Sequence, residues 1–286
     1  MTISAVFARL FNILGQMLAP VQPSPARSAV VWNYLILTIK ATFFGKRRPD
    51  RVRVLGRFVS PDSYALLRVL FVEIFVRREY EFVATREDPL IIDCGGNIGI
   101  ATLFFSMQYP KARIVTMEPS PGSFVRLRKM KDWNKLDRVE LHNVAVARSD
   151  GHIDLYYDEM HPASVEASLS PNRGGPVAVQ VRAVRLSTFI TEEVDLLKID
   201  IEGAEMEVLD ELAASGKLNK VRQIAVEFHH HVEPNENRLS QFLKLFEANG
   251  FGYQIRTATQ RPVQLGSFQD VMIYAYRMGA SPAQYR

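Results

Sequence analysis

The chain has 286 residues but only one cysteine, Cys94, so an internal disulfide is excluded and a reducing, cytoplasmic setting is expected. Cys94 lies in an apolar run without an obvious partner base, which predicts a small core residue rather than a nucleophile. No basic leader precedes the first apolar stretch, so a secretory signal is not expected. Residues 28–44 are apolar but carry Lys40 and fall short of the ~20 residues that span a bilayer. They predict a packing or interface helix.

A strong excess of one charge is also missing. The 35 basic and 31 acidic residues leave a net charge of +4, which is too small to indicate nucleic-acid binding. We expect a solvated basic face instead. Hydrophobic residues make up 47% of the chain and charged residues 23%, as in ordinary globular proteins, so a sizeable core can form.

Three zones follow one another along the chain. Residues 1–45 are apolar and helical in pattern, and residues 46–88 are mixed and open with a basic cluster. Residues 89–277 alternate short apolar runs with helical patterns, which predicts βαβ units and a parallel sheet. We therefore predict an N-terminal helical extension over residues 1–50 and one domain over residues 51–286.

The periodicity places the elements of the domain. The predicted sheet strands are residues 89–94, 113–117, 139–146, 195–199, 223–228, 251–255 and 271–276. The predicted helices are residues 98–108, 121–133, 204–215 and 237–249. Ser120 and Pro121 have the character of an N-cap and a first helical position. Residues 153–157 and 177–184 predict a hairpin-like excursion, joined by a loop rich in Ser, Pro and Gly.

A glycine turn follows the first predicted strand of the domain, with Gly95, Gly96 and Gly99 leading into a helix. Free backbone N–H groups and the positive end of the helix favour an anionic group there. The spacing is not the Gly-x-Gly-x-x-Gly of dinucleotide sites. The carboxylate of Asp93 would repel a pyrophosphate but attract the α-ammonium and sulfonium groups of S-adenosylmethionine.

Glu118 ends the next predicted strand and can accept hydrogen bonds from both hydroxyls of an adenosine ribose. Together with Asp93 and the glycine turn, it predicts S-adenosylmethionine as the cofactor. An NAD-dependent oxidoreductase on a related fold and a non-catalytic, cofactor-binding scaffold are the alternatives.

Several motifs occur in an order and spacing that identify a family. They are Glu73-Ile74-Phe75 with Tyr80, Ile92-Asp93-Cys94-Gly95-Gly96-Asn97-Ile98-Gly99, Glu118-Pro119-Ser120-Pro121, His142-Asn143-Val144-Ala145-Val146, Leu197-Lys198-Ile199-Asp200-Ile201-Glu202-Gly203-Ala204-Glu205 and Val226-Glu227-Phe228-His229. With them, residues 50–277 resemble the FkbM-type class I methyltransferases. The family more often has Val or Ile, Gly and Ala where this chain has Cys94-Gly95-Gly96, and both changes exchange small residues for small ones.

The resemblance implies an α/β fold of the Rossmann-like class: a seven-stranded, mostly parallel sheet with helices on both faces and one antiparallel strand. It implies methyl transfer from S-adenosylmethionine to a hydroxyl oxygen of a sugar, polyketide or other small metabolite. The implied cofactor-binding residues are Asp93, Gly95, Asn97, Gly99 and Glu118, with Asn143 and Ala145 beside the adenine.

A hydroxyl acceptor must lose its proton, so we expect a general base. Asp200 and Glu202 flank the end of the fourth sheet strand, at the edge where open α/β folds bind ligands. Asp200 is the first candidate for a catalytic or substrate-orienting role, and its alternative is a cap of the helix over 203–215. Glu205 and Glu207 are expected to solvate the first helical turn.

Histidines follow the fifth sheet strand. Strand alternation puts Glu227, His229 and His231 on one face if the strand persists. His229 is the candidate base among them, and a run of surface histidines is the alternative. With Asp200 these residues could bind a divalent metal, but the spacing is not a strong metal signature, so no metal is predicted.

Glu73, Tyr80, Glu202 and Glu227 are predicted to lie on the substrate side of the pocket. The loop over residues 161–176 is a candidate lid or acceptor-binding loop. The acceptor itself cannot be read from one sequence, because specificity depends on the shapes of loops.

The extreme N-terminus carries apolar side chains at helical spacing over residues 3–18. This amphipathic helix, with the basic cluster at 46–53, is a candidate for an interface with a second copy of the chain or for contact with a membrane surface. Burial against the domain or against a second copy is the more common outcome for such a helix.

Overall fold

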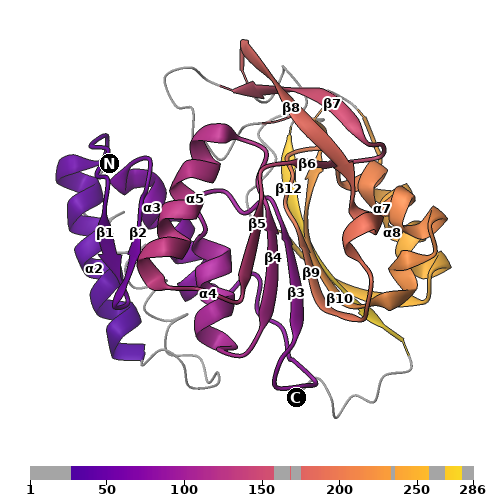
Figure 1. The fold of residues 1–286 in the computed structure, drawn as a ribbon, viewed down its shortest axis with the longest axis horizontal. Helices are drawn as coiled ribbons and strands as arrows, with labels where there is room; N and C mark the ends of the chain where they lie inside the picture. Colours follow the sequence, from indigo (N-terminus) through magenta and orange to yellow (C-terminus); the bar gives the residue numbers. More distant parts are fainter. Residues whose placement is uncertain (1–26, 158–167, 169–174, 233–235, 258–267, 279–286) are drawn as a thin grey trace.

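A computed structural model describes residues 27–157, 168, 175–232, 236–257 and 268–278 (Figure 1). A seven-stranded sheet forms its centre. In spatial order the strands are β11 (Phe251–Thr257), β12 (Gln269–Arg277), β10 (Val221–His230), β9 (Val194–Ile199), β3 (Leu90–Cys94), β4 (Arg113–Met117) and β5 (Val139–His142). β12 is antiparallel to both of its neighbours, and the other neighbouring pairs are parallel. The predicted sheet, with its one antiparallel strand, is confirmed.

Helices cover both faces of this sheet. Figure 1 shows α4 (Ile100–Gln108) and α5 (Pro121–Asn134) on one side, and α7 (Glu205–Ala214) and α8 (Leu239–Ala248) on the other. Side chains of one strand alternate between the two resulting cores. Ile91 packs in the core under α4, and Ile92 packs in the core under α7 and α8. A strand buried on both faces is mostly apolar, which is why β3 begins with the hydrophobic run Leu90-Ile91-Ile92.

The boundaries of α5 follow from local sequence. The Ser120 hydroxyl accepts a hydrogen bond from the Ser123 N–H, and Pro121 opens the helix. This capping arrangement was predicted from the sequence. It fixes where the chain turns from the end of β4 into the helix, directly beside the predicted cofactor site. The predicted core role of Cys94 is also confirmed, because its thiol is completely buried.

An N-terminal layer packs outside α4 and α5 (Figure 1). It consists of α2 (Arg27–Phe44), the hairpin β1 (Val52–Val54) and β2 (Arg57–Val59), α3 (Tyr64–Phe71) and the π-helical turn η1 (Val72–Val76). The Asn134 side chain accepts from the Phe58 N–H at 2.9 Å and donates to the Phe58 carbonyl at 2.7 Å, joining the hairpin to α5. Only α2 was predicted here, since three-residue strands are too short to show periodicity.

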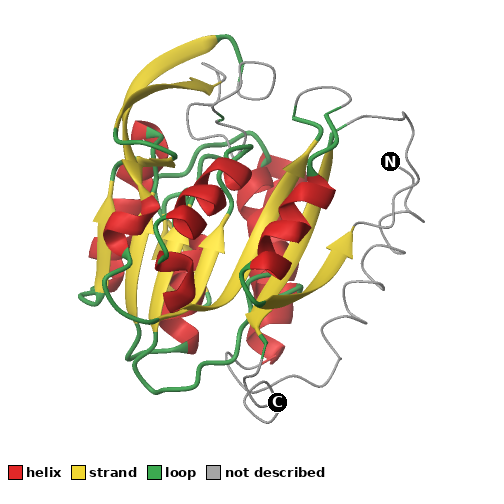
Figure 2. Ribbon diagram, turned by 90° about the vertical axis from the view of Figure 1, so that its right-hand side faces the viewer, coloured by secondary structure: helices red, strands yellow, loops and turns green. Residues whose placement is uncertain are grey.

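A second sheet rises above one end of the central sheet (Figure 2). It contains β6 (Ala145–Ala147), β8 (Val177–Arg185) and β7 (Gly151–Tyr157), with β7 and β8 paired antiparallel as predicted. The prediction of a single strand over residues 139–146 is wrong, because β5 ends at His142 and β6 belongs to the second sheet. Asn143 explains the break, since its amide donates to the carbonyls of Glu118 and Pro119 and holds the chain there.

The outer face of α2 exposes large apolar side chains at helical spacing. Trp32, Ile39 and Phe43 are 64%, 59% and 74% exposed. Among the described residues, no helix combines the length and apolarity needed to cross a bilayer. The predicted helix over 3–18 and nearly all of the loop over 161–176 lie outside the described residues. Contact with a second copy or a membrane surface therefore stays a prediction.

Candidate functional site

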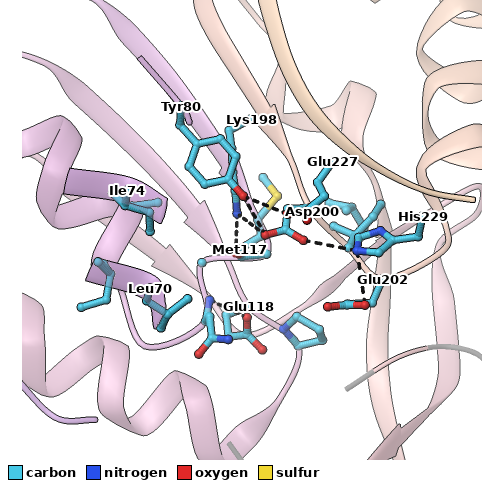
Figure 3. A pocket seen from close by; sticks show the side chains of 18 of the residues that line it. Leu70, Ile74, Tyr80, Met117, Glu118, Lys198, Asp200, Glu202, Glu227 and His229 are labelled. Carbon is cyan, nitrogen blue, oxygen red and sulfur yellow. Dashed lines mark hydrogen bonds and ion pairs between the residues drawn. The ribbon is translucent and has the colours of Figure 1, made fainter. Parts of the chain in front are cut away.

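A cavity of about 310 Å³ opens at the carboxyl ends of β3, β4, β9 and β10 (Figure 3). This is the edge where parallel α/β sheets bind their ligands, and the volume lies in the range of ligand pockets, about 300 to 1,000 Å³. The four residues predicted on the substrate side, Glu73, Tyr80, Glu202 and Glu227, all line it. Gly95, Gly96 and Asn97 of the glycine turn line it as well.

The glycine turn is held tightly against its neighbours. Gly95 and Gly96 donate their N–H groups to the Met117 carbonyl at 2.9 and 3.0 Å, which ties the turn to β4. Gly95 has a φ of +82°, and a Cβ at this position would overlap the backbone carbonyl oxygen of Asp200. Only glycine meets both demands, so the turn can lie directly against the end of β9.

Asn97 sits at the centre of the turn with a φ of +47° and lines the cavity. Its N–H donates to Glu118 Oε2 at 2.7 Å. Its side-chain oxygen is buried and finds no hydrogen-bond donor among the described residues. A buried acceptor without a donor costs about 1–3 kcal/mol. A ligand that brings a donor, such as an α-ammonium group, therefore fits this wall.

Glu118 is buried and lines the cavity, and its predicted contact with a ribose stays a prediction. It accepts hydrogen bonds from the N–H groups of Asn97 and Ser120 at 2.7 and 2.8 Å. Burial raises the pKa of Glu118 to about 7, even though these N–H groups oppose the shift. Ala145 also lines the cavity, whereas Asn143 holds the backbone of the loop that carries Glu118.

Asp93 lies beneath the turn and does not line the cavity. Its side chain is completely buried, Oδ2 accepts from the Thr102 hydroxyl at 2.7 Å, and Oδ1 lies 3.2 Å from Lys198 Nζ. Gly99 also lies away from the cavity, facing Met130 of α5. A direct contact of Asp93 or Gly99 with the cofactor stays a prediction.

Lys198 is a site residue that the sequence analysis missed. It is buried in β9, donates to the Gly95 carbonyl at 2.6 Å, and lies 3.5 Å from Asp200 Oδ2. Burial alone would lower its pKa, but the carboxylates of Asp93 and Asp200 outweigh burial and raise it. Lys198 is therefore a fixed cation that joins the glycine turn to the end of β9.

Tyr80 is buried over the ends of β9 and β10 (Figure 3). Its hydroxyl donates to Asp200 Oδ2 at 3.0 Å and lies 3.4 Å from Glu227 Oε2. Burial, with the nearby Asp200 carboxylate, raises the pKa of Tyr80 well above its usual value, so the side chain stays a phenol. Burial also raises the pKa of Glu227 to about 9 and that of Glu73 to about 8.

His229 is buried among carboxylates. Its Nδ1 lies 2.7 Å from Glu205 Oε1, and its Nε2 lies 3.3 Å from Glu202 Oε2 and 3.9 Å from Asp200 Oδ1. Burial would lower the pKa of His229, but these three carboxylates, Glu205 foremost, raise it to about 10. The imidazole is then protonated at neutral pH, which favours Asp200 over His229 as the base.

Three expectations about this edge need correction. Glu205 was expected only to solvate the first helical turn, but it is 1% exposed and pairs with His229 of β10. Asp200 does not cap α7, which begins at Glu205 after an N-cap at Ala204 without a side-chain hydrogen bond. β10 ends at His230, and His231 turns away with a φ of +60°, so the strand face stops before it.

This sheet order, with its glycine turn and acidic strand ends, defines the fold of class I methyltransferases. The sequence pattern of the family described as methyltransferase FkbM domain matches residues 93–254, and the chain belongs to that family. The resemblance inferred from the motifs is thereby confirmed.

Individual relatives agree with this assignment. The chain is 33% identical over 184 residues to Methyltransferase 1 of Beauveria bassiana, covering 56% of this chain and 74% of the relative. It is 30% identical over 174 residues to the 2-O-methyltransferase NoeI of Sinorhizobium fredii, covering 54% and 68%. It is 26% identical over 231 residues to the 31-O-demethyl-FK506 methyltransferase FkbM of Streptomyces tacrolimicus, covering 68% and 86%.

Proposed function

We propose that this protein transfers a methyl group from S-adenosylmethionine to a hydroxyl oxygen of a small or glycosidic metabolite. The observation that carries the proposal is one cavity with two unlike walls. One wall offers the Asn97 side-chain oxygen, which has no hydrogen-bond donor among the described residues, and the buried carboxylate of Glu118. The other offers Asp200, oriented by Tyr80. Membership of a methyltransferase family favours this function over an NAD-dependent oxidoreductase or a non-catalytic scaffold.

The cofactor wall suits a zwitterion. The Asn97 oxygen would accept from the α-ammonium, and the N-terminus of α4 would face the carboxylate. Glu118 would accept from the ribose hydroxyls, and the apolar side chains of Met117 and Val144 would pack against the adenine. When bound, S-adenosylmethionine supplies a methyl group that its sulfonium has already activated.

On the acceptor wall, Asp200 is the group that would receive the proton of the acceptor hydroxyl. Tyr80 donates to Asp200 Oδ2, and Lys198 lies beside the same oxygen, so both hold the Asp200 side chain in place. Asp200 would take the hydroxyl proton as the acceptor oxygen attacks the methyl carbon and the bond from that carbon to sulfur breaks. The remaining work of the protein is to align donor and acceptor.

Oxygen as the methylated atom has support from two relatives. One is named a 2-O-methyltransferase, and the other acts, by its name, on a 31-O-demethyl compound. Their names describe different acceptors. We therefore propose the class of reaction, with a hydroxyl as the acceptor group, for this chain.

Calorimetric titration of the full chain with S-adenosylmethionine and with NAD tests the cofactor. We expect saturable binding of the first and none of the second, and the opposite result would overturn the proposal. Asn97→Ala should weaken the binding of S-adenosylmethionine about tenfold, as expected for a lost hydrogen bond to a charged group. Asn237→Ala, at an exposed position, is the matched control and should bind normally.

The acceptor class needs a separate assay. Methyl transfer from labelled S-adenosylmethionine to hydroxylated sugars and polyketides should yield a labelled ether. Transfer confined to nitrogen or carbon acceptors in a parallel panel would contradict O-methylation and leave the cofactor assignment intact.

A further inference from the structure

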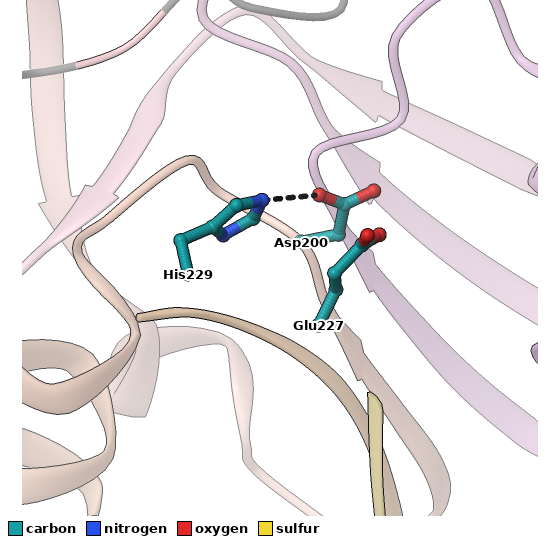
Figure 4. Close-up of side chains that lie close together, drawn as sticks. All are labelled: Asp200, Glu227 and His229. Atoms are coloured by element: carbon teal, nitrogen blue, oxygen red, sulfur yellow. Dashed lines mark ion pairs between the residues drawn. The ribbon is translucent and has the colours of Figure 1, made fainter. Parts of the chain in front are cut away.

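Three potential metal ligands meet where β9 and β10 end (Figure 4). One ligand atom each from Asp200, Glu227 and His229 lies within 4.8 Å of the other two. The parallel register, with Val226 opposite Ile199, sets these side chains next to one another. One imidazole and two carboxylates form a donor set suited to a divalent transition-metal ion such as Mn²⁺.

His229 is held as metal-binding histidines are held. Its Nδ1 lies 2.7 Å from Glu205 Oε1, and Glu205 is itself buried and fixed by the Gly203 N–H at 2.9 Å. A carboxylate on one ring nitrogen orients the ring, and the other nitrogen binds a metal as it releases its proton to solvent. The other nitrogen, Nε2, points toward Asp200 (Figure 4).

The separation of Nε2 from Asp200 Oδ1 is informative. At 3.9 Å it is too long for a hydrogen bond. Two atoms that each lie about 2.1 Å from one ion are about 3.0–4.2 Å apart for angles between about 90° and 180°. The pair is therefore already spaced for an ion between them. Glu227 offers a carboxylate oxygen within 4.8 Å of the ligand atoms of the other two residues.

The two carboxylate oxygens of Asp200 face different groups. Oδ2 receives the Tyr80 hydroxyl at 3.0 Å and lies 3.5 Å from Lys198 Nζ, whereas Oδ1 faces His229. Glu202 Oε2 lies 3.3 Å from His229 Nε2 and is a further oxygen close to an ion bound there. These contacts orient the ligand atoms before any ion arrives.

We propose that Asp200, Glu227 and His229 bind one divalent cation at the acceptor side of the cavity. An ion there has coordination positions left for the acceptor, and it favours an acceptor with two neighbouring oxygens, such as a vicinal diol. This last point rests on the proposed function, while cation binding does not. A hydroxyl bound to the ion has a lowered pKa and releases its proton to solvent, so Asp200 then acts as a ligand of the ion.

The test uses the full chain, freed of metal with a chelator and titrated with Mn²⁺ while electron paramagnetic resonance measures the free ion. We expect one saturable site per chain. Asp200→Asn and Glu227→Gln should each weaken binding at least about tenfold, and Glu205→Gln, a positioning change, about tenfold. Asp150→Asn is the matched control, because its carboxylate is exposed and pairs with Arg185.

A second measurement distinguishes a lost ligand from a misfolded variant. The spectrum of the bound ion should show coupling to one imidazole nitrogen, which His229→Gln removes while the thermal transition of the variant is retained. No saturable Mn²⁺ binding by the unmodified chain, or binding unchanged in Asp200→Asn, would overturn the site. Calorimetry with S-adenosylmethionine on the same sample separates this outcome from a failure of the proposed function.

Discussion

The two walls of the cavity are built by different means. The cofactor wall is mostly backbone: Gly95 and Asn97 adopt left-handed conformations and are tied by N–H groups to β4 and Glu118. The acceptor wall is mostly side chain, with Asp200 and His229 linked to partners from separate elements. Backbone geometry tolerates little change, whereas side-chain contacts can be removed one at a time. Cofactor affinity and turnover should therefore respond to different substitutions.

Gly95→Ala should have the largest effect. The left-handed backbone costs a non-glycine residue about 1–2 kcal/mol, and the overlap with the Asp200 carbonyl adds about 1–3 kcal/mol. We expect the free energy of unfolding to fall by about 2–5 kcal/mol and binding of S-adenosylmethionine to be lost. Denaturant unfolding and calorimetry measure the two quantities.

Gly56→Ala is the matched control for this change. Gly56 has nearly the same φ, +83°, but an added Cβ would meet nothing within 4 Å. The free energy of unfolding of Gly56→Ala should fall only by the cost of the left-handed backbone, about 1–2 kcal/mol, and its affinity for S-adenosylmethionine should not change. If the two variants bind S-adenosylmethionine equally well, the close approach at Gly95 does not shape the cofactor wall.

Asp200→Asn should lower turnover and leave the affinity for S-adenosylmethionine nearly unchanged. Loss of a general base lowers rates about 10²–10⁴-fold, and loss of a cation ligand gives a decrease of similar direction. The affinity for S-adenosylmethionine should stay within about twofold, because Asn97 and Glu118 are untouched. Single-turnover kinetics with an acceptor from the screen, combined with calorimetry, measures both. A large loss of cofactor affinity would show that the two walls are not independent.

Glu73→Gln should change the dependence of stability on pH. Burial, with Glu79 nearby, raises the pKa of Glu73 from 4.5 to about 8, so the folded chain keeps a proton that the unfolded chain releases. The contribution of Glu73 to stability is thus present below about pH 4.5 and lost as the pH rises to about 8. Glutamine cannot ionise. As the pH rises across this window, the free energy of unfolding of the variant should therefore increase relative to that of the unmodified chain, by on the order of 2 kcal/mol.

Urea unfolding at about pH 5 and about pH 8 measures this gain. Glu87→Gln is the control, since its side chain is 82% exposed and its difference from the unmodified chain should not vary with pH by more than about 0.5 kcal/mol. A flat difference for Glu73→Gln as well would mean that Glu73 is ionised in the folded protein.

Sequence patterns predicted those parts of the site that are local. The turn over 93–99 and the cap at Ser120 depend on residues adjacent in sequence. Asp200 and His229 were predicted near each other because neighbouring parallel strands end at one edge. Lys198 left a signal that was not used, since a lysine inside a buried strand needs buried anionic partners.

Other features depend on packing between distant segments. Glu205 has the sequence position of a solvated acid in a first helical turn, and only the placement of β10 against α7 brings His229 to it. The break in the predicted strand over 139–146 depends on Asn143 reaching the loop after β4. Neither contact leaves a periodic pattern in the sequence, because each joins residues more than twenty positions apart.

Tyr80→Phe should have the smallest effect and gives the finest test of the comparison. It removes the hydroxyl that orients Asp200 but keeps the buried ring. Tyr109→Phe is a matched change, because Tyr109 donates to the Phe82 carbonyl away from the cavity. Both should lose about 1–2 kcal/mol of stability, since each variant removes one hydrogen bond of a tyrosine hydroxyl. Only Tyr80→Phe should also slow turnover, about tenfold, with cofactor affinity unchanged. Equal turnover in the two variants would mean that Asp200 needs no orientation from Tyr80, and that Lys198 alone positions the acceptor wall.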